Sequence, residues 1–189
     1  MAARLVCLRH AQTLAAGRCV GRTDVSTKLL PKEASDKMRE ELSTWCRSAK
    51  AGLPPCSVWS SPLSRCQAPA AHLAAYHGVK MSTDPRLLEL DFGEWEGRTW
   101  AELEREDGER LLAWMNDWRV KAPPAGETTE ALTKRVSSWW QEQSTRSGLH
   151  VLVAHAGVVK ALLVMGGWTW DDAMSYPIPH LRAMAPFEQ

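Results

Sequence analysis

LVCLRHAQT, at residues 5–13, begins with four unbroken apolar residues and then changes abruptly to the pair Arg9 and His10. A short apolar run of this kind is typical of a strand that is buried on both faces, as in a parallel sheet. Residues 57–59 and 151–154 show the same pattern, the first of them more weakly. Each of these segments also ends in polar residues. The sequence therefore predicts at least three buried strands.

Segments with apolar residues at helical spacing lie between the predicted strands. They predict four helices. The first covers residues 31–49, the second begins after a capping box of Thr99 and Glu102, the third begins at Thr128 or Thr129, and the fourth covers residues 158–165 and ends at two glycines. In the second helix, Leu111, Met115 and Trp118 are expected on one face. Alternating strands and helices favour an α/β fold, a three-layer α/β/α sandwich with a mainly parallel central sheet. We expect one domain over residues 1–189.

The composition argues against several classes of protein. The formal net charge is +1, without a basic run, so nothing favours a nucleic-acid or anionic-membrane partner. The apolar run before Arg9 is too short for a signal peptide or a membrane span, which predicts a cytoplasmic protein. Five cysteines without a C-x-x-C pair match no zinc spacing and indicate free thiols.

The polar residues that follow the three strands form the main functional signal. In an open α/β sheet, ligands bind beyond the carboxyl ends of the strands, so Arg9, His10, Arg65 and His155 are expected to converge there. Two arginine forks suit a phosphate dianion, and a neutral imidazole can attack phosphorus. The alternative is that the arginines form surface ion pairs and the histidines are hydrogen-bonded loop residues. Taken together, the four residues favour a phosphate site.

Six short blocks of the sequence follow one another in a fixed order. The blocks are LRHAQT at 8–13, GRTD at 21–24, SSPLSR at 60–65, LELDFGEWEG at 88–97, PAGET at 124–128 and VAHAGV at 153–158. They span residues 5 to about 165, nearly the whole chain, and together they resemble the histidine phosphatase superfamily, in its phosphoglycerate-mutase-like branch. Residues 113–118 further resemble the α-ribazole phosphatases of cobalamin biosynthesis.

This resemblance implies an enzyme, a phosphoric monoester hydrolase without a metal or another cofactor. It makes His10 the nucleophile that forms a phosphohistidine, with Arg9, Arg65 and His155 around the phosphoryl group. Glu89 corresponds to the acid that protonates the leaving oxygen, although it also lies in an ordinary acidic stretch with Asp91, Glu94 and Glu96. Second-rank contacts to the phosphate or its substituent are Thr13 and Arg22.

The expected substrate is a small phosphorylated metabolite. Trp114 offers a flat surface to an aromatic group such as the benzimidazole of α-ribazole 5′-phosphate. Alternatively, Trp114 and Trp118 only pack their helix onto the body. A broad-specificity phosphatase of small metabolites and a phosphoglycerate mutase are the competing enzymatic hypotheses.

Three departures from the family pattern support a hypothesis of another class, an inactive member that binds a phosphorylated ligand. Ala11 replaces the glycine of the signature, and Ala16 replaces a frequent asparagine. Pro69 lies inside a helix that Ser61 is expected to cap, where a kink would shift Arg65. The sequence leaves open the oligomeric state and whether residues 175–189 cover the site or add an edge strand.

Overall fold

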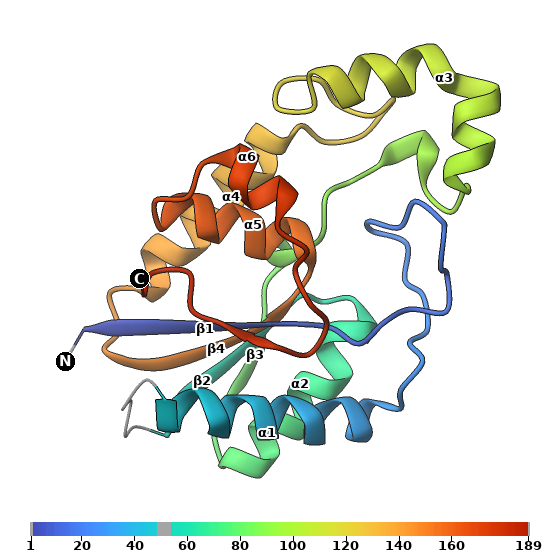
Figure 1. Cartoon of the computed structure of the whole chain (residues 1–189). Coiled ribbons are helices and arrows are strands. Elements are labelled where there is room, and N and C mark those ends of the chain that lie inside the picture. The colour runs from blue at the N-terminus through green and yellow to red at the C-terminus, as the bar shows by residue number, and fades with distance from the viewer. Residues whose placement is uncertain (1, 49–53, 189) are drawn as a thin grey trace.

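A five-stranded sheet forms the centre of the computed structural model, which describes residues 2–48 and 54–188 (Figure 1). The strand order is β3-β2-β4-β1-β5, and the first four of these strands run parallel. β5 pairs antiparallel with the edge of β1. The strands are β1 (Ala3–Arg9), β2 (Pro55–Ser60), β3 (Met81–Thr83), β4 (Gly148–Ala154) and β5 (Ala183–Met184). The prediction of a mainly parallel sheet is confirmed.

Helices cover both faces of the sheet and complete the predicted three layers. In Figure 1, α1 and α2 lie below the sheet and α4, α5 and α6 lie above it, whereas α3 stands apart at the upper right. The helices are α1 (Pro31–Ser48), α2 (Ser64–His77), α3 (Trp100–Asn116), α4 (Thr129–Gln143), α5 (Ala156–Met165) and α6 (Trp170–Ser175), with short 3-10 turns at Pro85–Leu87 and Gly93–Trp95. Among the described residues, no helix is long and apolar enough to cross a membrane.

The two faces of β1 explain its unbroken apolar sequence. Leu5 and Cys7 pack into the core with α4 and α5, while Val6 and Leu8 pack into the core with α1 and α2. Successive side chains of a strand point to opposite faces, so a central strand needs apolar residues at every position. β4 follows the same rule, since its last six residues are buried.

Helix boundaries agree with the sequence in most places. Thr99 and Glu102 form the predicted capping box, and Thr128 caps α4. The first helix ends at Ser48, and Ala49 lies outside the described residues. The predicted face of the second helix is confirmed for Leu111, which is buried, and is wrong for the other two residues, since Met115 is 59% exposed and Trp118 lies beyond the end of α3. Trp114 packs against the same small core as Leu111.

The start of α2 also differs from the prediction. α2 begins at Ser64 and not at Pro62, and the capping carboxylate comes from Asp24, which accepts hydrogen bonds from the amide and hydroxyl of Ser64 at 3.0 and 2.9 Å. Ser61 Oγ accepts a long hydrogen bond from the amide of Leu63, at 3.4 Å, and also has the partner described below. Pro69 lies inside α2, and Arg65 still reaches the site described below.

Candidate active site

A polar cavity of about 290 Å³ lies at the carboxyl ends of the central strands. Five of the residues predicted from the sequence line it, namely Arg9, His10, Thr13, Arg65 and Glu89. His155 is not part of the lining, but its ring lies beside that of His10, with centroids 5.2 Å apart. Arg22 and Trp114 lie outside the lining. The remaining wall consists of Gln12, Ala15, Ala16, Gly17, Arg18, Val20 and His180.

His10 is held as a neutral imidazole with one free ring nitrogen. Its amide donates to the carbonyl of Ala154 at 3.1 Å, which fixes the residue at the end of β4. Its Nδ1 lies 2.7 Å from the carbonyl of Ala11, and since a carbonyl only accepts, Nδ1 carries the proton. Burial and then the charges of Arg65 and Arg9 lower the pKa of His10 to about 3, against the hydrogen bond to Ala11. Nε2 therefore keeps its lone pair at neutral pH.

His155 is fully buried and depends on a residue that the sequence did not point to. Its Nε2 lies 2.8 Å from Ser61 Oγ, so the side chain that was expected to cap α2 orients this imidazole. The sulfur of Cys66 lies 3.6 Å from the same nitrogen. Burial, followed by the charge of Arg65, holds the pKa of His155 well below its usual value. The position of Ser61 just beyond β2 was the available signal.

Arg9 and Arg65 line the cavity and are held there by hydrogen bonds to backbone carbonyls. Arg9 Nη1 donates to the carbonyl of Ile178 at 2.7 Å, and Arg65 donates to the carbonyls of Thr23 and Gly21 at 2.7 and 2.5 Å. The Nε atoms of both arginines are buried and have no hydrogen-bond partner within the described parts of the chain. The two guanidinium groups place positive charge at the wall of the cavity, which suits a bound anion.

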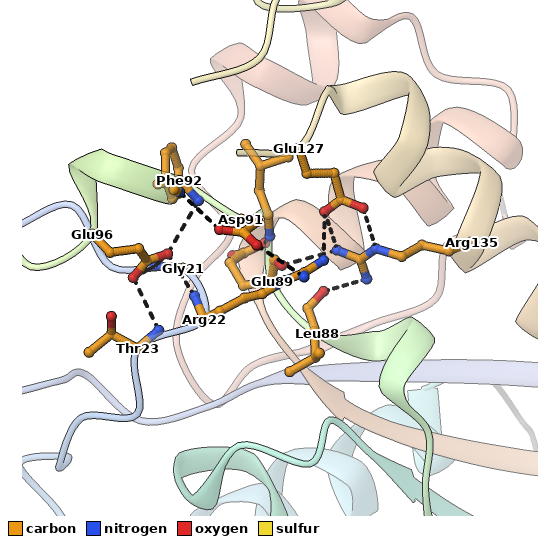
Figure 2. A network of polar contacts seen from close by, with 12 residues as sticks. Gly21, Arg22, Thr23, Leu88, Glu89, Asp91, Phe92, Glu96, Glu127 and Arg135 are labelled. Carbon is orange, nitrogen blue, oxygen red and sulfur yellow. Dashed lines mark hydrogen bonds and ion pairs between the residues drawn. The ribbon is translucent and has the colours of Figure 1, made fainter. Parts of the chain in front are cut away.

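The turn at Gly21 that holds Arg65 is fixed by the carboxylate of Glu96 (Figure 2). Glu96 accepts hydrogen bonds from the amides of Gly21 at 3.0 Å, Arg22 at 2.8 Å and Thr23 at 3.1 Å. Residue 21 must be glycine, because a Cβ there would lie 1.9 Å from the carbonyl oxygen of Leu90. Glu96 thus sets the carbonyls that aim Arg65, a role that sequence reasoning missed.

Arg22 is committed to a second part of this network. Its guanidinium pairs with Asp91 at 3.0 Å and with Glu127 at 3.3 Å (Figure 2). Arg135 from α4 also pairs with Glu127 and donates to the carbonyl of Glu89 at 3.0 Å. The structure therefore ties Arg22 to the loop that carries Glu89 and does not bring it to the polar cavity.

Glu89 joins the polar cavity to a second, apolar one. Both of its carboxylate oxygens lie 3.1 Å from the amide of Gly157, at the start of α5. A Cβ at Gly157 would lie 2.3 Å from this carboxylate, so glycine permits the approach. Glu89 also lines an apolar cavity of about 180 Å³, whose wall includes Trp114, Trp118 and Trp170. One carboxyl group thus faces both spaces.

Trp114 fits both of the roles weighed from the sequence. Its ring packs edge-to-face on Phe92 and on Trp95, with centroids 6.0 and 5.7 Å apart, so it holds α3 against the loop that follows Glu89. The same ring lines the apolar cavity. Trp118 packs edge-to-face on Trp170 of α6 at 5.5 Å, and both line the same cavity.

The C-terminal residues both cover the site and add an edge strand. β5 extends the sheet beside β1, and the segment before it places His180 in the cavity wall. His180 Nδ1 donates to the carbonyl of His10 at 2.6 Å, and the two rings lie 5.5 Å apart. Nothing in the spacing of the sequence indicated His180, which stands 170 residues from His10.

Within the described ranges, no group of three or more His, Cys, Asp or Glu side chains is placed to hold a metal ion. The cavity wall instead carries cationic groups, Arg9, Arg18 and Arg65. The cavity is therefore suited to an anionic ligand, and reaction without a metal stays a prediction.

The histidine pKa values predict how stability changes with pH. The pKa of His10 is about 3 in the folded protein and about 6.5 in an unfolded chain, so acid protonates the unfolded state first. We expect the free energy of unfolding to fall as the pH drops from about 6.5 toward 3, with His10 contributing about 1.4 kcal/mol per pH unit. Urea unfolding at pH 7, 5 and 4 measures this slope. The variant His10→Gln should be less acid-sensitive by that amount, and an unchanged slope would contradict the assignment.

Comparison with known proteins agrees with this geometry. The sequence matches the histidine phosphatase superfamily (branch 1) over residues 5–181. An adenosylcobalamin/alpha-ribazole phosphatase of Escherichia coli (strain K12) is 32% identical over 108 residues, which are 56% of this chain and 53% of that protein. A glucosyl-3-phosphoglycerate phosphatase of Mycolicibacterium vanbaalenii is 33% identical over 172 residues, 84% of this chain and 72% of that protein.

A solved structure shows the same fold over almost all of the chain. The alpha-ribazole phosphatase from Shigella flexneri superposes with a TM-score of 0.81 at 23% identity, covering 96% of this chain and 89% of that one. The sequence match to the Escherichia coli relative spans only about half of that protein's length. The fold and the family are therefore shared, whereas the named substrates belong to the relatives.

Proposed function

Because this chain belongs to the histidine phosphatase superfamily, we propose that it is a phosphoric monoester hydrolase that works through a phosphohistidine at His10. The observation that carries the proposal is the neutral imidazole of His10, placed in one cavity with the guanidinium groups of Arg9 and Arg65. A nucleophile and preorganised cations are what phosphoryl transfer requires.

In the first step, His10 Nε2 attacks the phosphorus of the ester. The N–P bond forms as the bond from phosphorus to the leaving oxygen breaks, and Glu89 in its protonated form gives that oxygen a proton. Arg9 and Arg65 stabilise the charge on the other phosphoryl oxygens. Nδ1 keeps its proton, which stays hydrogen-bonded to the carbonyl of Ala11 and so stabilises the positive charge on the phosphorylated ring.

In the second step, water attacks the phosphohistidine. Glu89, now a carboxylate, takes a proton from the water as the new P–O bond forms and the N–P bond breaks. Inorganic phosphate leaves, and His10 returns to the neutral form. The cycle uses only groups that line the polar cavity.

The proposed substrate is α-ribazole 5′-phosphate or a related cobalamin precursor. Support comes from the tryptophan-lined cavity beside Glu89, which suits a flat aromatic group, and from the alpha-ribazole phosphatase relative. A glucosyl-3-phosphoglycerate substrate is a second candidate, because the relative with that name matches 84% of this chain.

Phosphate release tests the proposal. The purified protein, in EDTA, is given p-nitrophenyl phosphate, α-ribazole 5′-phosphate, glucosyl-3-phosphoglycerate and 3-phosphoglycerate with a bisphosphate primer. Turnover that survives EDTA supports the mechanism, and the order of kcat/KM values identifies the substrate class. Isomerised phosphoglycerate in place of free phosphate would indicate a mutase. Phosphate-dependent binding without turnover of any ester would support the inactive, ligand-binding alternative.

Trp114→Ala tests the aromatic part of the substrate. We expect KM for α-ribazole 5′-phosphate to rise about 5- to 10-fold, because a ring contact worth about 1 kcal/mol is lost. KM for glycerol 1-phosphate, which has no ring, should change less than about 2-fold. The variant Trp114→Phe keeps an aromatic ring and controls for loss of packing against Phe92 and Trp95. An equal rise for both esters would reject stacking on Trp114.

A further inference from the structure

Lys160 is a cationic side chain in the wall of the apolar cavity. It lies on α5, one turn after Gly157, and it lines the same space as Trp118 and Trp170. Its Nζ donates to the carbonyl of Met174 at 3.0 Å and lies 3.8 Å from the sulfur of that residue. Burial lowers the pKa of Lys160, although the charge of Glu89 acts in the opposite direction. An ammonium group has three donors, and only one has an oxygen partner among the residues that the structure describes.

The position of Glu89 connects this cavity to the reaction. Glu89 lines both cavities, and in the proposed function it protonates the oxygen that leaves the phosphorus. When the leaving oxygen of a substrate lies at Glu89, the rest of the leaving alcohol therefore lies directly beside the apolar cavity. The tryptophans supply flat apolar surface, and among the described residues Lys160 is the one cation in that wall.

We propose that Lys160 determines substrate specificity by donating a hydrogen bond to an acceptor atom of the leaving group, held in the cavity between Trp114, Trp118 and Trp170. The substrate class is a phosphate ester whose leaving group includes a planar, largely apolar ring system with one acceptor, such as a ring nitrogen or a carboxylate. This inference rests on the proposed function, because it takes Glu89 as the group beside the leaving oxygen. An acceptor in this cavity receives a charge-assisted hydrogen bond from the ammonium, whereas a purely apolar group offers the ammonium no acceptor.

A different role for Lys160 predicts a different result. Lys160 also interacts electrostatically with Glu89, so its removal could act on proton transfer alone. In that case every ester would lose activity to a similar extent. A specificity role affects only those esters that carry an acceptor.

The experiment compares two esters of the same size and shape. These are 2-naphthyl phosphate, which has no acceptor on its ring, and 6-quinolinyl phosphate, in which one ring CH is replaced by nitrogen. A third ester, 6-carboxy-2-naphthyl phosphate, separates a carboxylate from a neutral acceptor. Each kcat/KM is measured for the wild type and for Lys160→Met, which keeps an apolar stem, and the ratio of the two cancels differences in leaving-group reactivity.

We expect Lys160→Met to lower kcat/KM about 10- to 100-fold for at least one acceptor-bearing ester and less than about 2-fold for 2-naphthyl phosphate. Lys160→Arg, which keeps a donor, should restore part of the loss. Lys37→Met, at an exposed position of α1, is the matched control and should leave all three esters unchanged. Equal losses for all esters, or no loss for any, would overturn the proposal.

A binding measurement separates this inference from the proposed function. If the wild type releases no phosphate from any ester, the proposed function fails, and the free alcohols 2-naphthol and 6-hydroxyquinoline are then titrated by quenching of tryptophan fluorescence. Tighter binding of 6-hydroxyquinoline that disappears in Lys160→Met supports the role of Lys160. Equal binding of both alcohols, or no binding, contradicts it.

Discussion

Replacement of His10 by alanine is expected to lower kcat for every phosphate ester by at least about 10⁴-fold, because the atom that accepts the phosphoryl group is removed. Phosphate release in EDTA measures the loss. Wild-type protein, quenched in alkali during turnover of a ³²P-labelled ester, should carry acid-labile label, and the variant should carry none. The cavity should still bind phosphate in the variant, since Arg9 and Arg65 remain.

The matched control is His72→Ala, which removes an exposed histidine from α2. It should turn over at the wild-type rate. Retention of more than a tenth of the activity in His10→Ala would show that another group is the nucleophile.

Glu89→Gln should separate esters by their leaving groups. Glutamine keeps the size of the side chain but supplies no acidic proton, so kcat/KM for an alkyl phosphate should fall about 10²- to 10⁴-fold. p-Nitrophenolate leaves without a proton, so p-nitrophenyl phosphate should lose less than about 10-fold in the first step. The ratio of kcat/KM between the two esters is the decisive measurement.

Glu94→Gln is the control from the same acidic stretch. The Glu94 side chain is 58% exposed and faces Arg110 at 3.5 Å, so its loss should change neither rate. A uniform loss for both esters in Glu89→Gln would instead assign Glu89 to a structural role at the start of α5.

Prediction from the sequence worked best where the surroundings of a residue follow from its position in a strand. Residues 5–8 are apolar throughout because β1 is buried on both faces, and this pattern, together with the alternation of strands and helices, indicated a parallel sheet. The convergence of Arg9, His10 and Arg65 followed from a general property of such sheets, that strand ends meet at one edge. These inferences needed no knowledge of side-chain contacts.

Side chains that bind backbone groups of a distant segment could not be predicted in this way. Glu96 resembles any solvated carboxylate in the sequence, yet it accepts three amides of the turn at Gly21. His180 belongs to a segment without strand or helix periodicity, which is held at the site by a bridge to Arg9 and a hydrogen bond to the carbonyl of His10. The face of α3 was predicted wrongly because Met115 and Trp118 have helical spacing, while the helix ends at Asn116.

The contacts that build the polar cavity also describe how the site must form during folding. Arg65 meets Thr23 across 42 residues, Arg22 meets Glu96 across 74, and His180 meets His10 across 170. Closing such long loops costs chain entropy before any contact compensates for it, so native pairings of this kind form late. Helices and local turns therefore form before the polar cavity is complete. During refolding, recovery of activity reports completion of the tertiary structure better than recovery of the helical circular dichroism signal does.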